Sequence, residues 1–223
     1  MKHLSQLTLV LLLTGCASTS RVARIDNALL SELPASSMAG IVEARATKDT
    51  AEDAVAKAER DEQWAKEQVE QTRSNLKVAR TELDDAKLAM VLAERSGTVA
   101  QLEAAKKAFA YSSAHSDEVR DLLALRKREF EHSKLLRKVA EEELRLKYAQ
   151  LELEKAEAVV VLDRVAAQQV PVKDYRKQVR YHETEVGVAR IRAEAAGSEA
   201  DDARQVADES HSRAVALRKA MQG

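Results

Sequence analysis

The chain contains few of the residues that build turns, sheets and thick cores. Its 223 residues include six Gly, two Pro and one Cys, and aromatic residues make up only 3%. So few turn-forming residues exclude a sheet domain or a fold with many loops. A thick globular core would need more Phe, Leu and Ile than the chain supplies.

The chain also lacks an excess of charge of one sign. It has 36 basic and 37 acidic residues, and loss of the first fifteen residues would remove only Lys2, leaving a net charge of −2. Basic residues alternate with acidic ones and are not interleaved with aromatic residues, which argues against binding of DNA or RNA. There is no Gly-rich phosphate loop and no place for a Ser/His/Asp arrangement. We therefore expect no catalytic site and no cofactor.

The composition is typical of long helices, with 33% charged residues and much Ala, Leu and Gln. Between Thr98 and Gln168 there is neither Gly nor Pro, and large apolar residues recur every seven positions. A seven-residue apolar step predicts a helix that packs along another helix. The members of this first stripe are Leu102, Phe109, Leu123, Phe130, Leu144, Leu151, Ala158 and Val165, interrupted by Ser116 and Arg137.

A second apolar stripe on the same segment predicts a second partner helix. Two residues of helix turn by about 200°, so a series offset by two lies on nearly the opposite face. This stripe starts only near Leu122, so its partner should cover only the later part of the segment. Its members are Leu125, Val139, Leu146, Leu153 and Val160, interrupted by His132.

Apolar spacings of three and four predict the two partner helices. The first should span about residues 37–95, with Ser36 or Ser37 as its cap. It should end at Ser96 and Gly97, where Gly can adopt the left-handed conformation. Thr98 and Gln101 then form a capping box for the central helix, about residues 98–168.

The last helix should span about residues 171–221, with Pro171 in its first turn, where the missing N–H costs nothing. Its seam is rich in Ala and contains His182. The sequence thus predicts an all-α fold: three long antiparallel helices in an elongated coiled-coil bundle over residues 37–223. Because the turns are short, neighbouring helices should be antiparallel. The numbers of two residues that lie opposite each other should then add up to about 194 for the first and second helices and to about 339 for the second and third. The opposite stripes could be satisfied by a flat layer within one chain or by self-association.

The N-terminus resembles a secretion signal. Lys2 precedes an apolar run from Leu7 to Leu13, which is too short to cross a bilayer as a mature helix and predicts a signal peptide over residues 1–15. Residues 17–36 predict a tether. An apolar pattern within it, at Val22, Ile25, Leu29 and Leu33, would form either a segment lying on lipid headgroups or a frayed helical turn.

Leu13-Thr14-Gly15-Cys16 resembles the lipobox of bacterial lipoproteins. The resemblance implies that Cys16 is diacylglycerylated, that the signal is cut just before it, and that the new amine is acylated, which leaves no thiol for a disulfide. In enteric bacteria an Asp after this Cys retains the protein in the inner membrane. Ala17 stands here instead, which favours the periplasmic face of the outer membrane. In a host with a single membrane, the same motif implies the outer face of that membrane. The alternatives are an ordinary cleaved signal or a small buried Cys.

Two helical motifs raise the question of a metal. Glu129 and His132 have the Glu-x-x-His spacing of di-iron bundles, and the antiparallel pairing puts His211, with Asp208 before it, opposite about residue 128. The alternative is a polar layer that fixes the helix register. We favour the polar layer and expect no metal. It would consist of His132 and Ser210 on facing seams, with Glu62 and Arg137 at a similar height.

These features favour a structural or interaction protein: a lipid-anchored helical spacer or scaffold in the periplasm, with the membrane as one partner and another protein or a second copy as the next. Residues 162–196 also look like the coiled-coil hairpins of efflux and secretion adaptors, but nothing here can form the β-rich domains of that class. A holdase or a peptidoglycan-binding module is a third alternative. The expected docking tips are Ser96, Gly97 and Thr98 at one turn, and Gln169, Val170 and Pro171 at the other.

Overall fold

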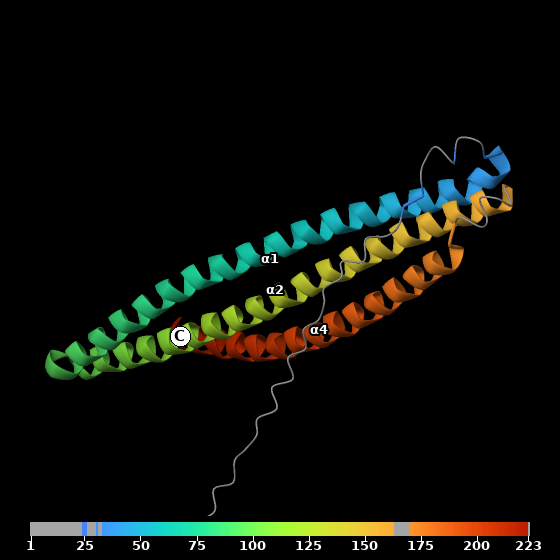
Figure 1. Ribbon diagram of the computed structural model, residues 1–223. Coiled ribbons are helices and arrows are strands. Elements are labelled where there is room, and N and C mark those ends of the chain that lie inside the picture. Colours follow the sequence, from blue (N-terminus) through green and yellow to red (C-terminus); the bar gives the residue numbers. More distant parts are fainter. Residues whose placement is uncertain (1–23, 26–29, 31–32, 163–169, 223) are drawn as a thin grey trace, which may run out of the picture.

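The computed structural model describes an elongated protein built from three long helices (Figure 1). They are α1 (Ala35–Ser96), α2 (Val99–Leu162) and α4 (Val172–Gln222), and there is no strand in the described part of the chain. With 64 residues, α2 is about 96 Å long at 1.5 Å per residue. The predicted all-α fold is confirmed. The described residues are 24–25, 30, 33–162 and 170–222.

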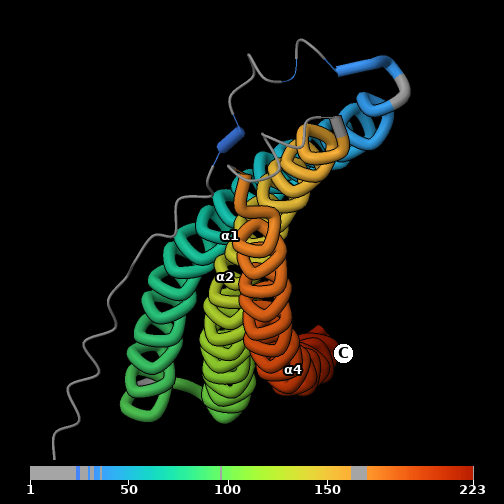
Figure 2. Tube along the Cα trace, turned by 45° about the vertical axis from the view of Figure 1, so that its right-hand side comes forward, coloured from blue at the N-terminus to red at the C-terminus, as the bar shows by residue number. Residues whose placement is uncertain are grey.

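The helices form a flat layer with α2 in the middle (Figure 2). Both α1 and α4 pack along α2, and among the described residues they do not pack against each other. This arrangement satisfies the two opposite stripes of α2 within one chain. We call the α1–α2 turn the hairpin end, and the opposite end, where α1 and α4 begin, the N-terminal end. Because α4 stops before the hairpin end, that end consists of two helices only (Figure 1).

The predicted seams coincide with the buried faces of the flanking helices. In α1, the residues that follow the spacing of three and four from Ala51 to Ala93 are all buried or half-buried, and in α4 only Met221 of the corresponding residues is exposed. The members in α1 are Ala51, Val55, Ala58, Glu62, Ala65, Val69, Thr72, Leu76, Ala79, Leu83, Ala86, Met90 and Ala93, and those in α4 are Val172, Tyr175, Val179, His182, Val186, Ala189, Ala193, Ala196, Ala200, Ala203, Ala207, Ser210, Ala214, Leu217 and Met221. The small Ala side chains let helix axes approach closely, but each contact removes little apolar area from water. Stability is therefore spread along the whole length of the layer. The buried Ala residues of α4 are Ala193, Ala200, Ala207 and Ala214.

The start of α1 differs from the prediction. The helix begins at Ala35, its N-cap residue is Pro34, and no side chain caps it. The predicted cap by Ser36 or Ser37 is wrong, because the Pro34 carbonyl already accepts a hydrogen bond from the Ser37 N–H at 2.9 Å. The helix thus begins two to three residues earlier than it would with Ser36 or Ser37 as its cap.

The sums on the flank of α1 lie at or slightly above the predicted value, whereas those on the flank of α4 lie below it. Glu62 binds Arg137 and Glu52 binds Tyr148, and these pairs of residue numbers add up to 199 and 200. A Cβ on Gly40 would lie 2.8 Å from Glu154 Oε2, and these residue numbers add up to 194. Across the other flank, Arg190 binds Glu143 and Arg204 binds Glu129, and both pairs of numbers add up to 333 instead of 339.

Candidate functional site

The hairpin end places Ser96, Gly97 and Thr98 at the tip of the two-helix arm. Gly97 has φ −85° and ψ 161°, so the predicted left-handed conformation is wrong. Its N–H donates to the Ala93 carbonyl at 2.9 Å. A Cβ at this position would lie only 2.6 Å from that oxygen. Gly97 is therefore needed for a close approach of backbone atoms.

The predicted capping box after this turn is confirmed. The Thr98 N–H donates to Gln101 Oε1 at 2.7 Å, and the Gln101 N–H donates back to Thr98 Oγ1 at 3.3 Å. These two bonds satisfy donors that the first turn of α2 leaves open. Val99 beside this ordered tip is 80% exposed, and Leu88, about 13 Å back along α1, is 59% exposed. The hairpin end thus presents apolar side chains on a fixed backbone.

At the N-terminal end, the described apolar residues that precede α1 pack onto the layer. One apolar cluster brings together residues of all three helices with Ile25 and Leu30, and Leu33 packs against it. The sequence pattern that includes Ile25 and Leu33 thus makes an intramolecular contact in the described part. Val22 and Leu29 of that pattern lie outside the described residues. The helical members of the cluster are Ile41, Leu151, Ala156, Val159 and Tyr175.

A buried ion pair fixes Ile25 there. The Ile25 N–H donates to Glu152 Oε2 at 2.6 Å, and Lys155 Nζ donates to Glu152 Oε1 at 2.7 Å. The side chains of Lys155 and Glu152 are only 9% and 5% exposed. Both carboxylate oxygens therefore have partners, which a buried charge requires. Sequence reasoning missed this site, because a Glu and a Lys three residues apart are common in a solvated helix.

The other residues predicted for lipidation and docking lie near this end or outside the described part. Cys16 and Gln169 are outside the described residues. Val170 is half-buried against the cluster, whereas Pro171 is exposed and its carbonyl accepts the Asp174 N–H at 2.8 Å. The exposed side chains that follow are mainly basic: Lys173, Arg176, Lys177 and Arg180.

The two histidines of the predicted metal motifs lie apart. His211 Nδ1 is 2.6 Å from Glu118 Oε1, and His115 Nδ1 is 3.0 Å from the other oxygen of Glu118. Burial alone would raise the pKa of Glu118, but hydrogen bonds to both histidines hold it below its ordinary value. His132 lies instead beside Gly197, where a Cβ would be 3.3 Å from the ring.

The shifted register of α4 also changes the predicted polar layer. Ser210 donates to Asp121 and not to His132, so that half of the prediction is wrong. The other half is confirmed, because Arg137 Nε donates to Glu62 Oε2 at 2.5 Å and the same guanidinium binds Glu141. No group of three or more His, Cys, Asp or Glu residues in the described part is placed to hold a metal ion.

His182, which the sequence pattern places on the seam of α4, is buried in an unusual way. His182 is 3% exposed, and neither ring nitrogen has a hydrogen-bond partner among the described residues. Its Nδ1 is 4.0 Å from Glu142 Oε2. Burial lowers the pKa of His182, and Arg145 lowers it further, whereas Glu142 acts in the opposite direction.

A shallow groove of about 540 Å³ crosses the layer, lined by Thr50 and Ala54 of α1, Leu146 of α2, and Val186 and Arg190 of α4. Arg190 is bound to Glu143 on its rim at 2.5 Å. Lys147 and Glu183 complete the charged part of its lining. The groove is a feature of helix packing.

No protein-family model, no curated protein and no solved structure matches the chain. Among the described residues, none of the helices combines the length and the apolar character that a membrane span requires.

Proposed function

We propose that the chain is a non-catalytic, lipid-anchored helical spacer of the bacterial envelope, attached through acyl groups on Cys16 to the periplasmic face of the outer membrane. The observation that carries this proposal is the fixed position of Ile25, whose N–H is bound to the buried Glu152. Ile25 follows Cys16 by nine residues, which reach at most about 32 Å when fully extended. An anchor on Cys16 would hold the N-terminal end near the membrane.

The length of the layer then sets the distance to the other end. The 62 residues of α1 extend about 93 Å at 1.5 Å per residue. A rod standing on its N-terminal end would present the tip around Gly97 far from the bilayer. Two or three acyl chains, at about 0.8 kcal/mol for each buried CH₂, would make the attachment lasting.

Metabolic labelling with a clickable fatty acid tests the anchor. We expect label on the wild-type chain in the membrane fraction, and we expect Cys16→Ser to lose both the label and membrane retention. A Cys16→Ser chain that stays labelled, or a wild-type chain that is unlabelled and soluble, would contradict the anchor. The matched control is Ser18→Cys in the Cys16→Ser background, which restores a thiol but not the Leu-Thr-Gly-Cys sequence.

A second candidate, an adaptor of a trans-envelope machine, is favoured by one observation. The hairpin end exposes the apolar side chains of Val99, next to an ordered turn, and of Leu88. An adaptor predicts that Leu88→Asp with Val99→Asp abolishes function in cells without a change in melting temperature. A spacer predicts that this variant behaves like Val78→Asp, which changes an equally exposed apolar residue of α1 away from the tip.

A further inference from the structure

We propose that the N-terminal end of the rod is a contact surface for anionic lipid headgroups, formed by the basic first turns of α4 together with the exposed Val161 of α2. The proposal rests on the proposed function, because it assumes that the lipid on Cys16 brings this end to a membrane. The proposal specifies which part of the protein contacts the bilayer and which class of lipid this surface prefers.

The first turns of α4 have a concentrated positive charge. Between residues 172 and 180 there are four basic residues and one acidic residue, all with exposed side chains. By contrast, residues 82–107 at the hairpin end contain five acidic and four basic residues. The chain as a whole is close to neutral, so the positive charge is local to these turns of α4. The basic residues are Lys173, Arg176, Lys177 and Arg180.

These charges are available to an outside anion. Lys173 and Arg180 have no ion-pair partner within the part of the chain that the structure describes. Arg176 pairs with Glu157 at 2.7 Å and Lys177 pairs with Asp174 at 2.9 Å, and all four of these side chains are exposed. Exposed pairs contribute only about 0–1 kcal/mol, so a phosphate can replace the carboxylate at little cost.

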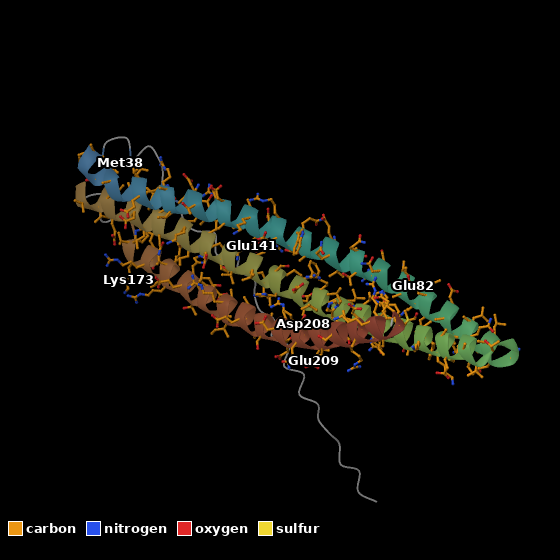
Figure 3. All side chains as sticks on the ribbon, turned by 180° about the vertical axis from the view of Figure 1, so that it is seen from behind. Met38, Glu82, Glu141, Lys173, Asp208 and Glu209 are labelled. Carbon is orange, nitrogen blue, oxygen red and sulfur yellow. The ribbon has the colours of Figure 1, made fainter. Side chains whose placement is uncertain are left out.

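The basic turns lie at the end of the rod to which the anchor segment is attached. Tyr175, within these turns, packs in the same cluster as Ile25 and Leu30. Figure 3 shows Lys173 and Met38 at one end of the molecule, with Glu82 toward the other. An acyl group on Cys16 would therefore bring these four cations near the headgroups.

An apolar side chain accompanies the cations. Val161 is 80% exposed on the last turn of α2, four residues after the Glu157 that binds Arg176. The exposed Glu154 of this end lies against Gly40 of α1, on the flank of α2 opposite α4. Basic side chains beside an exposed apolar one suit the boundary between headgroups and acyl chains, where burial of apolar area and attraction to anionic lipid add up.

Amine acylation of the processed full-length protein tests the surface. The protein is reconstituted through its own lipid into vesicles of phosphatidylcholine alone, or of phosphatidylcholine mixed with phosphatidylglycerol. Peptide mass spectrometry then gives the acylation rates of Lys173 and Lys177, with Lys87 and Lys107 of the hairpin end as internal controls. A contact worth about 1 kcal/mol per charge slows the reaction of Lys173 and Lys177 about fivefold in the anionic vesicles. High salt should abolish the difference.

A pair of matched variants sharpens the test. Arg176→Gln with Arg180→Gln removes two cations but keeps both reporter lysines, so the protection should weaken. Arg80→Gln with Arg95→Gln removes the same charge from exposed sites of α1 and should change nothing. Equal rates in both kinds of vesicle, equal protection of the hairpin lysines, or equal effects of both variants would overturn the proposal.

The experiment distinguishes failure of the lipid anchor from failure of the contact surface. If the purified chain has no lipid on Cys16, the proposed function fails. The same chain is then added to preformed vesicles, where protection of Lys173 that depends on phosphatidylglycerol still decides whether the surface exists. Absence of protection there would overturn the surface as well.

Discussion

His182 is a buried polar residue whose neighbours compensate little for its burial. Its ring is buried on the α2–α4 seam without a hydrogen bond among the described residues. A buried polar group without a partner costs about 1–3 kcal/mol. We expect His182→Leu to stabilise the fold by about 1 kcal/mol or more, measured as the free energy of unfolding in urea. His211→Leu, which removes an exposed ring bound to Glu118, is the control and should bring no gain. A less stable His182→Leu protein would show that the ring contributes useful packing.

The same residue should make stability depend on pH. Burial holds the pKa of His182 below its ordinary value of 6.5. Below that value the unfolded chain binds a proton that the folded chain does not, so stability falls as the pH falls from about 6.5 through the lower pKa of the folded state. The lowered pKa of Glu118 acts in a more acidic window, below its ordinary value of 4.5. We expect wild type to lose stability between about pH 7 and pH 5, and His182→Leu to lose less. Parallel curves for the two proteins would contradict this assignment.

The two glycines within α4 should respond differently to alanine. A Cβ on Gly187 would meet nothing within 4 Å, whereas a Cβ on Gly197 would lie 3.3 Å from the His132 ring. Alanine in a helix is favoured over glycine by about 0.8–1 kcal/mol. Gly187→Ala should gain most of this, and Gly197→Ala should gain less or lose stability. Thermal unfolding of both variants checks this, and equal gains would show that the His132 ring moves freely.

At the scale of the helices, the Ala seam of α4 sets how closely it approaches α2. Ala193 is buried on the seam, and Ala195 is exposed on the outer face of the same helix. We expect Ala193→Leu to cost about 1–3 kcal/mol through overpacking. Ala195→Leu changes the side chain by the same volume two residues away and should be nearly neutral. Chemical denaturation compares the two variants, and equal effects would mean that α4 is not held by this seam.

The seams could be predicted from the sequence because a periodic pattern determines which face of a helix is buried. The two stripes of α2 predicted two partners, and α1 and α4 occupy those two faces. The offset of α4 could not be predicted, because a periodic pattern indicates the buried face of a helix but not its register along the partner helix. That offset separates His132 from Ser210 and brings His211 to Glu118. The extended conformation of Gly97 and the contact of Ile25 with Glu152 are likewise tertiary features without a sequence period.

At the scale of the whole molecule, the flat layer has two unlike ends. The N-terminal end combines a buried ion pair, an apolar cluster and exposed basic turns. The hairpin end is two helices wide and exposes Val99 and Leu88. An elongated protein with unlike ends is suited to span a distance, since each end can have a different neighbour. We propose the membrane as the neighbour of the N-terminal end.

Photo-crosslinking in intact cells tests this orientation most directly. A photoreactive amino acid replaces Val161 in one chain and Val99 in another, since both side chains are 80% exposed and neither replacement disturbs the close contact at Gly97. The orientation predicts lipid adducts from position 161 and none from position 99, because the two ends are separated by about 90 Å of helix. Lipid adducts from both positions would mean that the rod lies flat on the membrane. Lipid adducts from position 99 alone would reverse the proposed orientation.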